Sequence, residues 1–371
     1  MKIMHLITGL QIGGAERMLY NLLKHRSLDH THEVVYFHHG PIADDIAALG
    51  IKTWHLKGLV SAYDPLGWWR AYQLIRCIKP DVIHTALWSA NIMGRILGKW
   101  CNIPVICDLH GDCRHHGWFR NFIERKTISL PTQYLAVATS VKEAFEGTFF
   151  RDQVDIPPVT VIPNGIDMVH LTSVSQVATD TLRAELKLLP HHFVIGSVGR
   201  LVAIKNYRLL LESFAQCIKQ TGQELVLIIV GDGPERASLI QQAALLGITA
   251  QVRFVGTRKD VHLFYHLFDC FVLSSDSEGM SMALLEALAA GCPLISTSTT
   301  LTHEVIAQGQ NGLLVPPNDP QVLAEALCCM IKNEKLRLSM QKNNLQKARD
   351  HFDIRQTVKI YDDLYQQIFQ K

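Results

Sequence analysis

Short apolar runs alternate with amphipathic stretches along the whole chain, and this alternation restricts the possible folds more than any other feature. In the first half, five runs have the length of buried strands, at residues 3–7, 34–37, 82–84, 105–108 and 134–137. Helical spacing of apolar residues separates several of them, at 15–24, 66–78 and 91–100. Strands that alternate with helices predict a parallel sheet with helices on both faces.

The second half repeats this pattern. Its strand-like runs lie at 194–198, 225–230, 252–255, 270–273 and 294–297, and its helical stretches lie at 207–220, 234–246 and 281–290. The chain has 371 residues, which is more than one hydrophobic core usually supports. We therefore expect two doubly wound, Rossmann-like α/β domains that face a central cleft, with ligands bound at the carboxyl ends of the strands.

A domain boundary is expected near residues 161–167, where Pro163 and Gly165 interrupt the regular pattern. The first domain would span 1–165 and the second 166–350. A final helix, within 351–371, follows the second unit.

Composition excludes several classes of protein. Charged residues are 19% of the chain and hydrophobic residues 48%, which indicates large cores and not disorder. A formal net charge of +2 argues against nucleic-acid binding driven by overall charge. Nine cysteines without a Cys-x-x-Cys pair are typical of free thiols in a reducing cytosol. Without a signal-peptide pattern or an apolar stretch long enough to span a bilayer, we expect a cytoplasmic protein.

Two glutamates, Glu278 and Glu286, lie eight residues apart where a loop enters a helix. The apolar run 270–273 before them predicts a buried strand, and residues 281–290 after them are strong helix formers. Glu278 would lie just before the helix, and Glu286 about one and a half turns inside it. Free N–H groups at the helix start favour an anionic ligand, and carboxylates bind hydroxyl groups. This combination suits a nucleotide-sugar.

Arg200 and Lys205 belong to a loop that follows the first strand of the second unit. Arginine grips phosphate through a planar fork, and lysine supplies a compact positive charge. Together they could neutralise a departing diphosphate. The loop lies at the carboxyl end of a strand, where this architecture binds its ligands.

Glycine-rich turns follow three further strands. The pair Gly13-Gly14 precedes a helix and could let backbone N–H groups approach a ligand, but it is not the Gly-x-Gly-x-x-Gly fingerprint of nicotinamide cofactors. The segment 231–235 is interpreted as a turn, with Pro234 at the first position of a helix. Gly256 and Arg258 follow the next strand and could touch a base.

The assembled pattern resembles the retaining glycosyltransferases of family 4, which have the GT-B fold. The resemblance spans nearly the whole chain, and its parts occur in order. They are Gly13–Glu16, 162–167, Gly199-Arg200 with Lys205-Asn206, Gly231–Pro234, Glu278 with Glu286, 311–317 and 361–365. One departure lies at residues 299–304, where relatives often carry a glycine pair before the glutamate.

The resemblance implies roles for individual residues. Arg200 and Lys205 would bind the donor diphosphate, and Glu286 the ribose hydroxyls. Glu278 would contact the transferred sugar, together with the backbone of three residues that follow it. These three are Gly279, Met280 and Ser281. Gly14 would bring a helix start to the donor. His110, after a strand, matches a histidine near the reacting centre of relatives, and the last helix would cross back to the first domain.

These roles predict a retaining hexosyl- or N-acetylhexosaminyl-type glycosyltransferase in cell-surface polysaccharide or glycoconjugate synthesis. A UDP-sugar is favoured over a GDP-sugar as co-substrate, no cofactor is expected, and no Asp-x-Asp metal site is evident. Arg200, Lys205 and helix N-termini would stabilise the leaving diphosphate. Two alternatives stay open: a nucleotide-sugar epimerase or phosphorylase on the same fold, and a non-catalytic nucleotide-sugar-binding subunit.

The acceptor is expected to be a saccharide or a lipid-linked glycan. Residues 114–126 mix aromatic side chains with Arg114, Arg120, Arg125 and Lys126. Such a segment could rest on an anionic membrane, which would make the protein peripheral on the inner face of the plasma membrane. The competing interpretation is that the aromatic side chains pack into the domain while the cations stay solvated.

Overall fold

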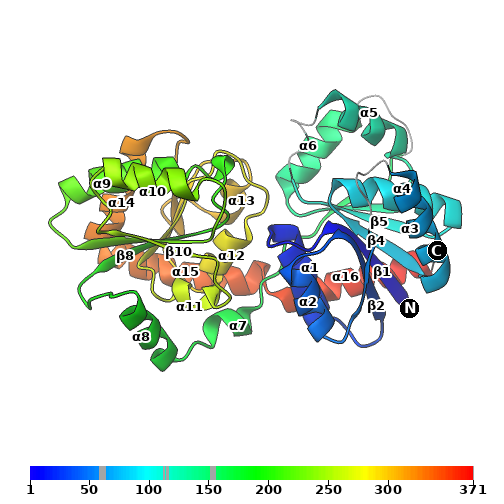
Figure 1. Cartoon of the computed structure of the whole chain (residues 1–371), viewed down its shortest axis with the longest axis horizontal. Helices are drawn as coiled ribbons and strands as arrows, with labels where there is room; N and C mark the ends of the chain where they lie inside the picture. Colours follow the sequence, from blue (N-terminus) through cyan, green and yellow to red (C-terminus); the bar gives the residue numbers. More distant parts are fainter. Residues whose placement is uncertain (58–63, 112, 114–116, 151–155, 371) are drawn as a thin grey trace. The chain divides into compact units, whose positions relative to one another are not determined.

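The structure, a computed structural model, describes residues 1–57, 64–111, 113, 117–150 and 156–370. It divides into two compact units. Unit 1 comprises Met1–Gly165 and Ile354–Lys371, and unit 2 comprises Ile166–Asp353. Each unit is built on one parallel sheet (Figure 1), which confirms the prediction of two doubly wound, Rossmann-like domains.

Unit 1 contains a seven-stranded sheet in the order β3-β2-β1-β4-β5-β6-β7. Its strands are β1 (Lys2–Gly9), β2 (Thr31–His38), β3 (Lys52–His55), β4 (Val82–Ala86), β5 (Val105–Leu109), β6 (Gln133–Ala136) and β7 (Val159–Val161). Its helices are α1 (Gly14–Lys24), α2 (Pro41–Ala48), α3 (Pro65–Ile78), α4 (Trp88–Cys101), α5 (Trp118–Thr127), α6 (Thr139–Phe149) and α16 (Ile354–Phe369). Helices α1, α2 and α16 cover one face of the sheet, and α3 and α4 the other (Figure 1).

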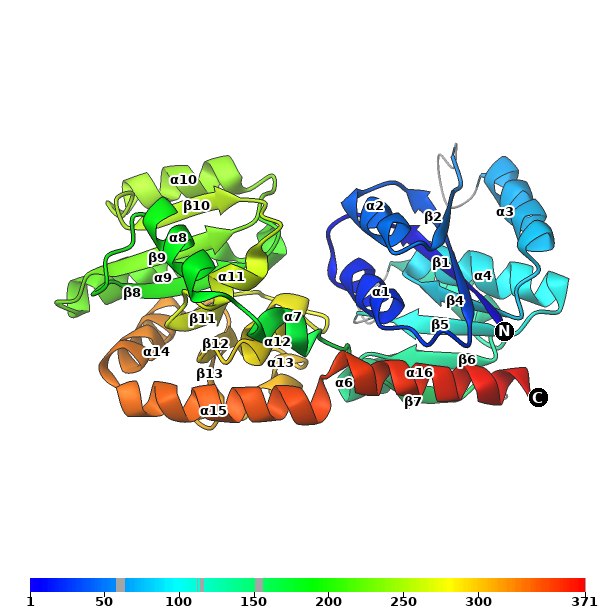
Figure 2. The same ribbon diagram turned by 90° about the horizontal axis from the view of Figure 1, so that it is seen from below.

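The terminal helix α16 lies along the sheet of unit 1 (Figure 2). Its buried residues recur at spacings of three and four, which places them on one helical stripe. These residues, among them Ile354, Val358 and Ile368, share a core with Ile3 of β1 and Val82 of β4. The stripe therefore explains why the last segment of the chain belongs to unit 1.

Unit 2 contains a six-stranded sheet in the order β10-β9-β8-β11-β12-β13. Its strands are β8 (Phe193–Val198), β9 (Leu225–Val230), β10 (Val252–Gly256), β11 (Cys270–Leu273), β12 (Leu294–Thr297) and β13 (Gly312–Val315). Its helices are α7 (Met168–Thr172), α8 (Gln176–Glu185), α9 (Tyr207–Gln220), α10 (Arg236–Leu245), α11 (Val261–Tyr265), α12 (Met282–Ala289), α13 (Thr302–Val305), α14 (Pro320–Lys332) and α15 (Glu334–His351), with a 3₁₀ turn at Ala203–Lys205.

Three strands escaped the sequence analysis: β3, β7 and β13. All three lie at sheet edges and are only three or four residues long. The expectation that Pro234 opens a helix was wrong, because α10 begins at Arg236 and Pro234 belongs to the preceding turn.

Candidate functional site

The centre of the sheet in unit 2 brings two chemically important loops together. Strands β8 and β11 are neighbours in the sheet, although more than 70 residues separate them in the chain. The direction of chain winding reverses between them, and in open α/β sheets ligands bind outside the carboxyl ends of the strands at this point. The loop 199–206 follows β8, and the loop 274–281 follows β11.

The loop after β8 is held by the turn after β9. The N–H of Leu201 donates to the Asp232 carbonyl at 3.0 Å, and the N–H of Glu235 donates to the Leu201 carbonyl at 3.0 Å. Gly231 has a φ of +136°, and a Cβ there would lie 1.9 Å from the Gly199 carbonyl oxygen. Only glycine fits such a position. Residues 231–235 therefore position the loop that carries Arg200 and Lys205.

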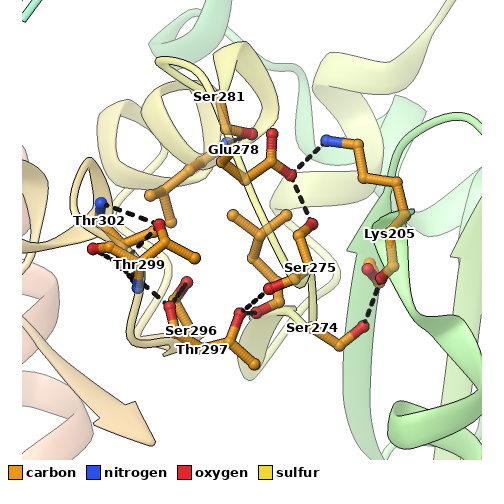
Figure 3. A network of polar contacts seen from close by, with 12 residues as sticks. Lys205, Ser274, Ser275, Glu278, Ser281, Ser296, Thr297, Thr299 and Thr302 are labelled. Carbon is orange, nitrogen blue, oxygen red and sulfur yellow. Dashed lines mark hydrogen bonds and ion pairs between the residues drawn. The ribbon is translucent and has the colours of Figure 1, made fainter. Parts of the chain in front are cut away.

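Lys205 and Glu278 meet across the two loops. Lys205 Nζ and Ser275 Oγ both donate to Glu278 Oε1 (Figure 3). Ser274 Oγ donates to the Lys205 carbonyl at 3.0 Å. The side chains of Lys205 and Glu278 are 21% and 8% exposed. The structure thus pairs two residues that the sequence analysis assigned to different parts of the donor.

Arg200 differs from Lys205 in its surroundings. It is exposed and lies next to Gly199 at the end of β8. Among the described residues its guanidinium has no ion pair or hydrogen bond, whereas Lys205 is bonded to Glu278. Arg200 is therefore the cation of this loop whose charge no neighbouring carboxylate compensates.

Asn206 organises the same region, and sequence reasoning gave it no role. Its φ of +45° is left-handed, and its Oδ1 caps α9 by accepting from the N–H of Leu209 at 3.2 Å. Its Nδ2 donates to Asp276 Oδ1 at 2.7 Å and to Asn318 Oδ1 at 2.8 Å. One asparagine thus ties the loops after β8, β11 and β13. Its position directly before an amphipathic helix was the available signal.

Glu286 lies on α12, as predicted, but just over one turn from the helix start at Met282, because the helix begins one residue later than expected. Tyr265 Oη donates to its Oε2 at 2.8 Å. Ser281 is the N-cap of α12 and accepts from the N–H of Leu284 at 3.4 Å. Gly279 is half-buried and Met280 is buried in the loop between the two glutamates. Glu278 and Glu286 therefore come from the same strand–loop–helix unit.

Threonines occupy the segment 299–302, where the sequence departs from the family pattern. Thr302 Oγ1 donates to the Thr297 carbonyl at 2.9 Å, and the N–H of Thr299 donates to Thr302 Oγ1 at 2.9 Å. Thr297 Oγ1 in turn donates to the Ser275 carbonyl (Figure 3). Hydroxyl groups thus connect the loop after β12 to the loop that carries Glu278.

Arg258 has a structural role that the sequence analysis did not consider. Its guanidinium lies 2.7 Å from Glu185 Oε1 and 2.8 Å from Asp260 Oδ2, and it stacks over the Phe264 ring at 5.3 Å. These contacts bind helix α8 to the segment that enters α11. Gly256, at the end of β10, has a φ of +72° with open space where a Cβ would lie. The contacts of Arg258 give no support to its assignment to a donor base.

In unit 1, Gly14 opens helix α1 and the extended Gly13 is its N-cap. His110 follows β5, and its side chain is 13% exposed. Its Nε2 lies 3.6 Å from Asp108 Oδ2, which is longer than a normal hydrogen bond. His110 belongs to unit 1, whereas the loops that carry Arg200 and Glu278 belong to unit 2.

Asp108 belongs to a buried cluster that sequence reasoning missed. His84 Nε2 lies 2.8 Å from Asp108 Oδ1, and His5 Nε2 lies 2.9 Å from His32 Nδ1. The ring centroids of His5 and His84 are 5.3 Å apart. A cavity of about 20 Å³ borders His5, His84, Asp108 and His110. The only available signal was a histidine in each of two strand-like runs, His5 in 3–7 and His84 in 82–84.

Burial sets the charges of this cluster. It lowers the pKa of His5, with His32 and His84 adding to the effect, and it lowers the pKa of His32 to about 3. Burial alone would raise the pKa of Asp108, but His84 and His110 outweigh it and hold that pKa well below its usual range. Asp108 is therefore a carboxylate at neutral pH, while His5 and His32 are uncharged.

One group of potential metal ligands occurs among the described residues: His191, His192 and Glu224. It lies at the amino ends of β8 and β9, at the opposite edge from Arg200. The N–H of Leu189 donates to His192 Nδ1 at 3.1 Å, so the proton of that neutral ring is on Nε2. Nε2 donates to Glu224 at 3.2 Å. This arrangement is a hydrogen-bonded histidine–carboxylate group, and its protonated Nε2 is not a metal ligand.

The aromatic residues of the segment that follows His110 lie on the surface. Trp118, Phe119 and Phe122 of α5 are 79%, 47% and 49% exposed. The rings of Trp118 and Phe122 stack at 6.2 Å. Arg120, Arg125 and Lys126 of the same helix are also exposed. The segment 114–126, which was expected to rest on a membrane, begins with Arg114, His115 and His116. These three residues lie outside the part of the chain that the structure describes.

Comparison with known proteins identifies the family. The model "Glycosyltransferase Family 4" matches residues 12–170, and "Glycosyl transferases group 1" matches residues 178–347. EpsF of Bacillus subtilis (strain 168), which is named as a glycosyltransferase, is 26% identical over 82% of this chain and 81% of its own length. A UDP-Gal:alpha-D-GlcNAc-diphosphoundecaprenol alpha-1,3-galactosyltransferase of Escherichia coli is 28% identical over 79% and 77%.

Solved structures agree on the fold. Anabaena Alr3699/HepE in complex with UDP-glucose superimposes with a TM-score of 0.87 at 23% identity, over 99% of this chain and 100% of that chain. The chain therefore belongs to the GT4-type glycosyltransferases and has the GT-B fold. Within the described part of the chain, no helix is both long and apolar enough to cross a bilayer.

Proposed function

We propose that this glycosyltransferase moves a sugar from a nucleotide-sugar donor to a saccharide or lipid-linked glycan acceptor, with retention of the anomeric configuration. The observation that carries the proposal is the ion pair of Lys205 and Glu278 at the carboxyl edge of β8 and β11, with Arg200 on the same loop as Lys205. Structural neighbours in complexes with UDP and with UDP-glucose, and a relative named for UDP-Gal, favour a UDP-sugar. The transferred group would be a hexose or an N-acetylhexosamine.

The proposed reaction separates charge. The bond between the anomeric carbon and the diphosphate oxygen breaks, and its electron pair stays on the diphosphate. The acceptor hydroxyl oxygen forms its bond to the same face of the anomeric carbon, and its proton passes to the leaving oxygen. Arg200 and Lys205 stabilise the growing negative charge, as preorganised cations do best in a site that excludes water. Glu278 and His110 contact the sugar that is transferred, and cell-surface polysaccharide or glycoconjugate synthesis is the process that uses the product.

A donor screen with the purified full chain tests this proposal. We expect release of a nucleoside diphosphate and a product heavier by one sugar, with a UDP-sugar as the best donor. Because two cations supply the diphosphate site, activity should persist in excess chelator. Epimer formation without transfer, or binding without turnover across a broad acceptor panel, would contradict the proposal. Activity that disappears in chelator and returns with magnesium or manganese would contradict its metal-free part.

Substitution of the two glutamates should separate donor binding from transfer. Glu286→Gln is expected to weaken nucleoside-diphosphate binding, because its carboxylate is assigned to the ribose hydroxyls. Glu278→Gln is expected to lower the transfer rate more strongly, because it contacts the sugar and also fixes Lys205. Calorimetric affinity and the transfer rate are measured for each folded variant, with Glu325→Gln on α14 as an exposed control. Unchanged nucleotide affinity in Glu286→Gln would show that the roles are assigned wrongly.

The exposed aromatic residues of α5 are expected to bind anionic membranes. Trp118 and Phe122 would enter the interface while Arg120 and Lys126 meet lipid headgroups, each basic contact contributing about 1 kcal/mol. Cosedimentation with vesicles that contain anionic lipid should therefore be strong at low salt and weaker at high salt. Trp118→Ser should reduce binding, whereas Trp100→Ser, at another exposed tryptophan on α4, should not. No sedimentation of the unaltered chain at low salt would rule this out and favour a soluble acceptor.

A further inference from the structure

A directed chain of hydrogen bonds runs through the buried cluster of unit 1. His84 lies between two partners, with Nε2 2.8 Å from Asp108 Oδ1 and Nδ1 2.6 Å from Tyr365 Oη. A carboxylate can only accept, so when the His84 ring is neutral its proton is on Nε2. The lone pair of Nδ1 then accepts from the Tyr365 hydroxyl. The contacts therefore define one tautomer of His84 and one direction for the whole chain.

The carboxylate of Asp108 is the next member of this chain, and its main chain is fixed as well. The Asp108 carbonyl accepts from Asn91 Nδ2 at 2.9 Å, and Asn91 Oδ1 accepts from Thr85 Oγ1 at 2.7 Å. The second carboxylate oxygen of Asp108, Oδ2, lies 3.6 Å from His110 Nε2. When Nε2–H of His110 donates to this oxygen, the lone pair of Nδ1 is left for a ligand. Such bonds are often long until the ligand is bound.

We propose that Tyr365, His84 and Asp108 are positioning residues for His110, so that the seating of α16 on the sheet sets the tautomer and orientation of the His110 ring. The functional consequence rests on the role of His110 in the proposed function. The chain begins on the last helix, passes through β4 and the end of β5, and stops at the first residue after β5.

Packing alone does not account for this chain. The other buried residues of α16 in this core, such as Ile354, Val358 and Ile368, hold the helix by apolar contact. An aspartate and a histidine buried beneath that helix cost desolvation energy that apolar residues would avoid. Tyr361 and His5 also border His84, at ring-centroid distances of 5.4 and 5.3 Å. Burial raises the pKa of Tyr361, and its interaction with the Asp108 carboxylate adds to the effect. Tyr361 is therefore a second neighbour of Asp108, separate from the path that runs from Tyr365 through His84.

The first test observes the His110 ring directly. Histidine-selective ¹⁵N labelling of the full chain reports the tautomer of each ring, and the His110 signals are those lost in His110→Ala. Tyr365→Phe keeps the aromatic ring and removes one hydroxyl group. We expect it to shift the His110 signals towards a mixture of tautomers. The matched control is Tyr134→Phe, which removes a buried hydroxyl bonded to the Ile128 carbonyl at 2.8 Å in the same unit. Unaltered His110 signals in folded Tyr365→Phe would overturn the proposal.

The second test is a double-mutant cycle on transfer. Tyr365→Phe should lower kcat about tenfold, the lower end for residues that orient a functional group. In the His110→Ala background the same substitution should have no further effect, because residues that act through one another are not additive. An equal loss in both backgrounds would mean that Tyr365 acts independently of His110 and would overturn the proposal. Full activity of His110→Ala would instead refute the role of His110 in the proposed function, and the ¹⁵N test would then decide the positioning on its own.

Discussion

Replacing Arg200 by alanine is expected to lower turnover by roughly 100- to 1,000-fold, the range seen when one preorganised electrostatic group is removed from a site. Arg200 is exposed at the end of β8, and no described carboxylate compensates its charge. Its loss should therefore leave folding intact and remove stabilisation from the departing diphosphate. Turnover, nucleotide affinity and thermal unfolding are measured together. Arg349→Ala, an exposed arginine of α15, is the matched control.

Lys205→Ala is expected to cause a loss of similar size, but through two contributions. Lys205 stabilises the diphosphate and also holds Glu278, whose side chain is nearly buried. A double-mutant cycle with Glu278→Ala separates these two contributions. In the Glu278→Ala variant, the part of the Lys205→Ala effect that acts through Glu278 is already lost. Folded Arg200→Ala and Lys205→Ala variants with near-normal turnover would show that this loop is not the diphosphate site.

Removing one partner of the buried ion pair in unit 1 is expected to destabilise that unit by about 3–5 kcal/mol. Arg95 of α4 is fully buried, and its Nη1 bonds Glu124 of α5 and lies 3.2 Å from Thr127 Oγ1. Arg95→Met leaves the Glu124 carboxylate buried without its cation. The double variant Arg95→Met/Glu124→Leu removes both charges and should recover most of the lost stability.

Hydrogen exchange resolved to α4 and α5 is the suitable measurement, because a two-domain chain does not unfold in one step. The control is the half-buried pair of Lys142 and Glu146 on α6, whose N–O distance is 3.8 Å. Breaking that pair should cost less than about 1 kcal/mol. Equal protection of α4 and α5 in Arg95→Met and in the unaltered chain would disprove the prediction. Because α5 carries the exposed aromatic residues, the same variant should also weaken vesicle binding.

Local patterns in the sequence were sufficient for the elements near the site. Apolar residues recur every second residue in a strand and every 3.6 residues in a helix, and this spacing can be seen within a short stretch of sequence. The bounds of β8, α9 and α12 could therefore be predicted closely. The same holds for the place of Glu286 on its helix. Alternation of strands and helices implies a parallel sheet, and a parallel sheet has all its carboxyl ends at one edge. The loops of Arg200 and Glu278 could therefore be assigned to the same edge before any contact was known.

Which side chains meet at that edge is decided by tertiary structure. Lys205 and Glu278 are 73 residues apart and touch only because β8 and β11 are adjacent in the sheet. Arg258 pairs with Glu185 of α8, which no local pattern relates to it. The chain from Tyr365 to Asp108 joins residues 281 and 24 positions apart. By itself the sequence determined the elements near the site and the edge that carries the chemistry, because these follow from local periodicity. The order of the strands and the packing of the helices decided which side chains contact one another, because the distances between these side chains depend on how the whole chain packs.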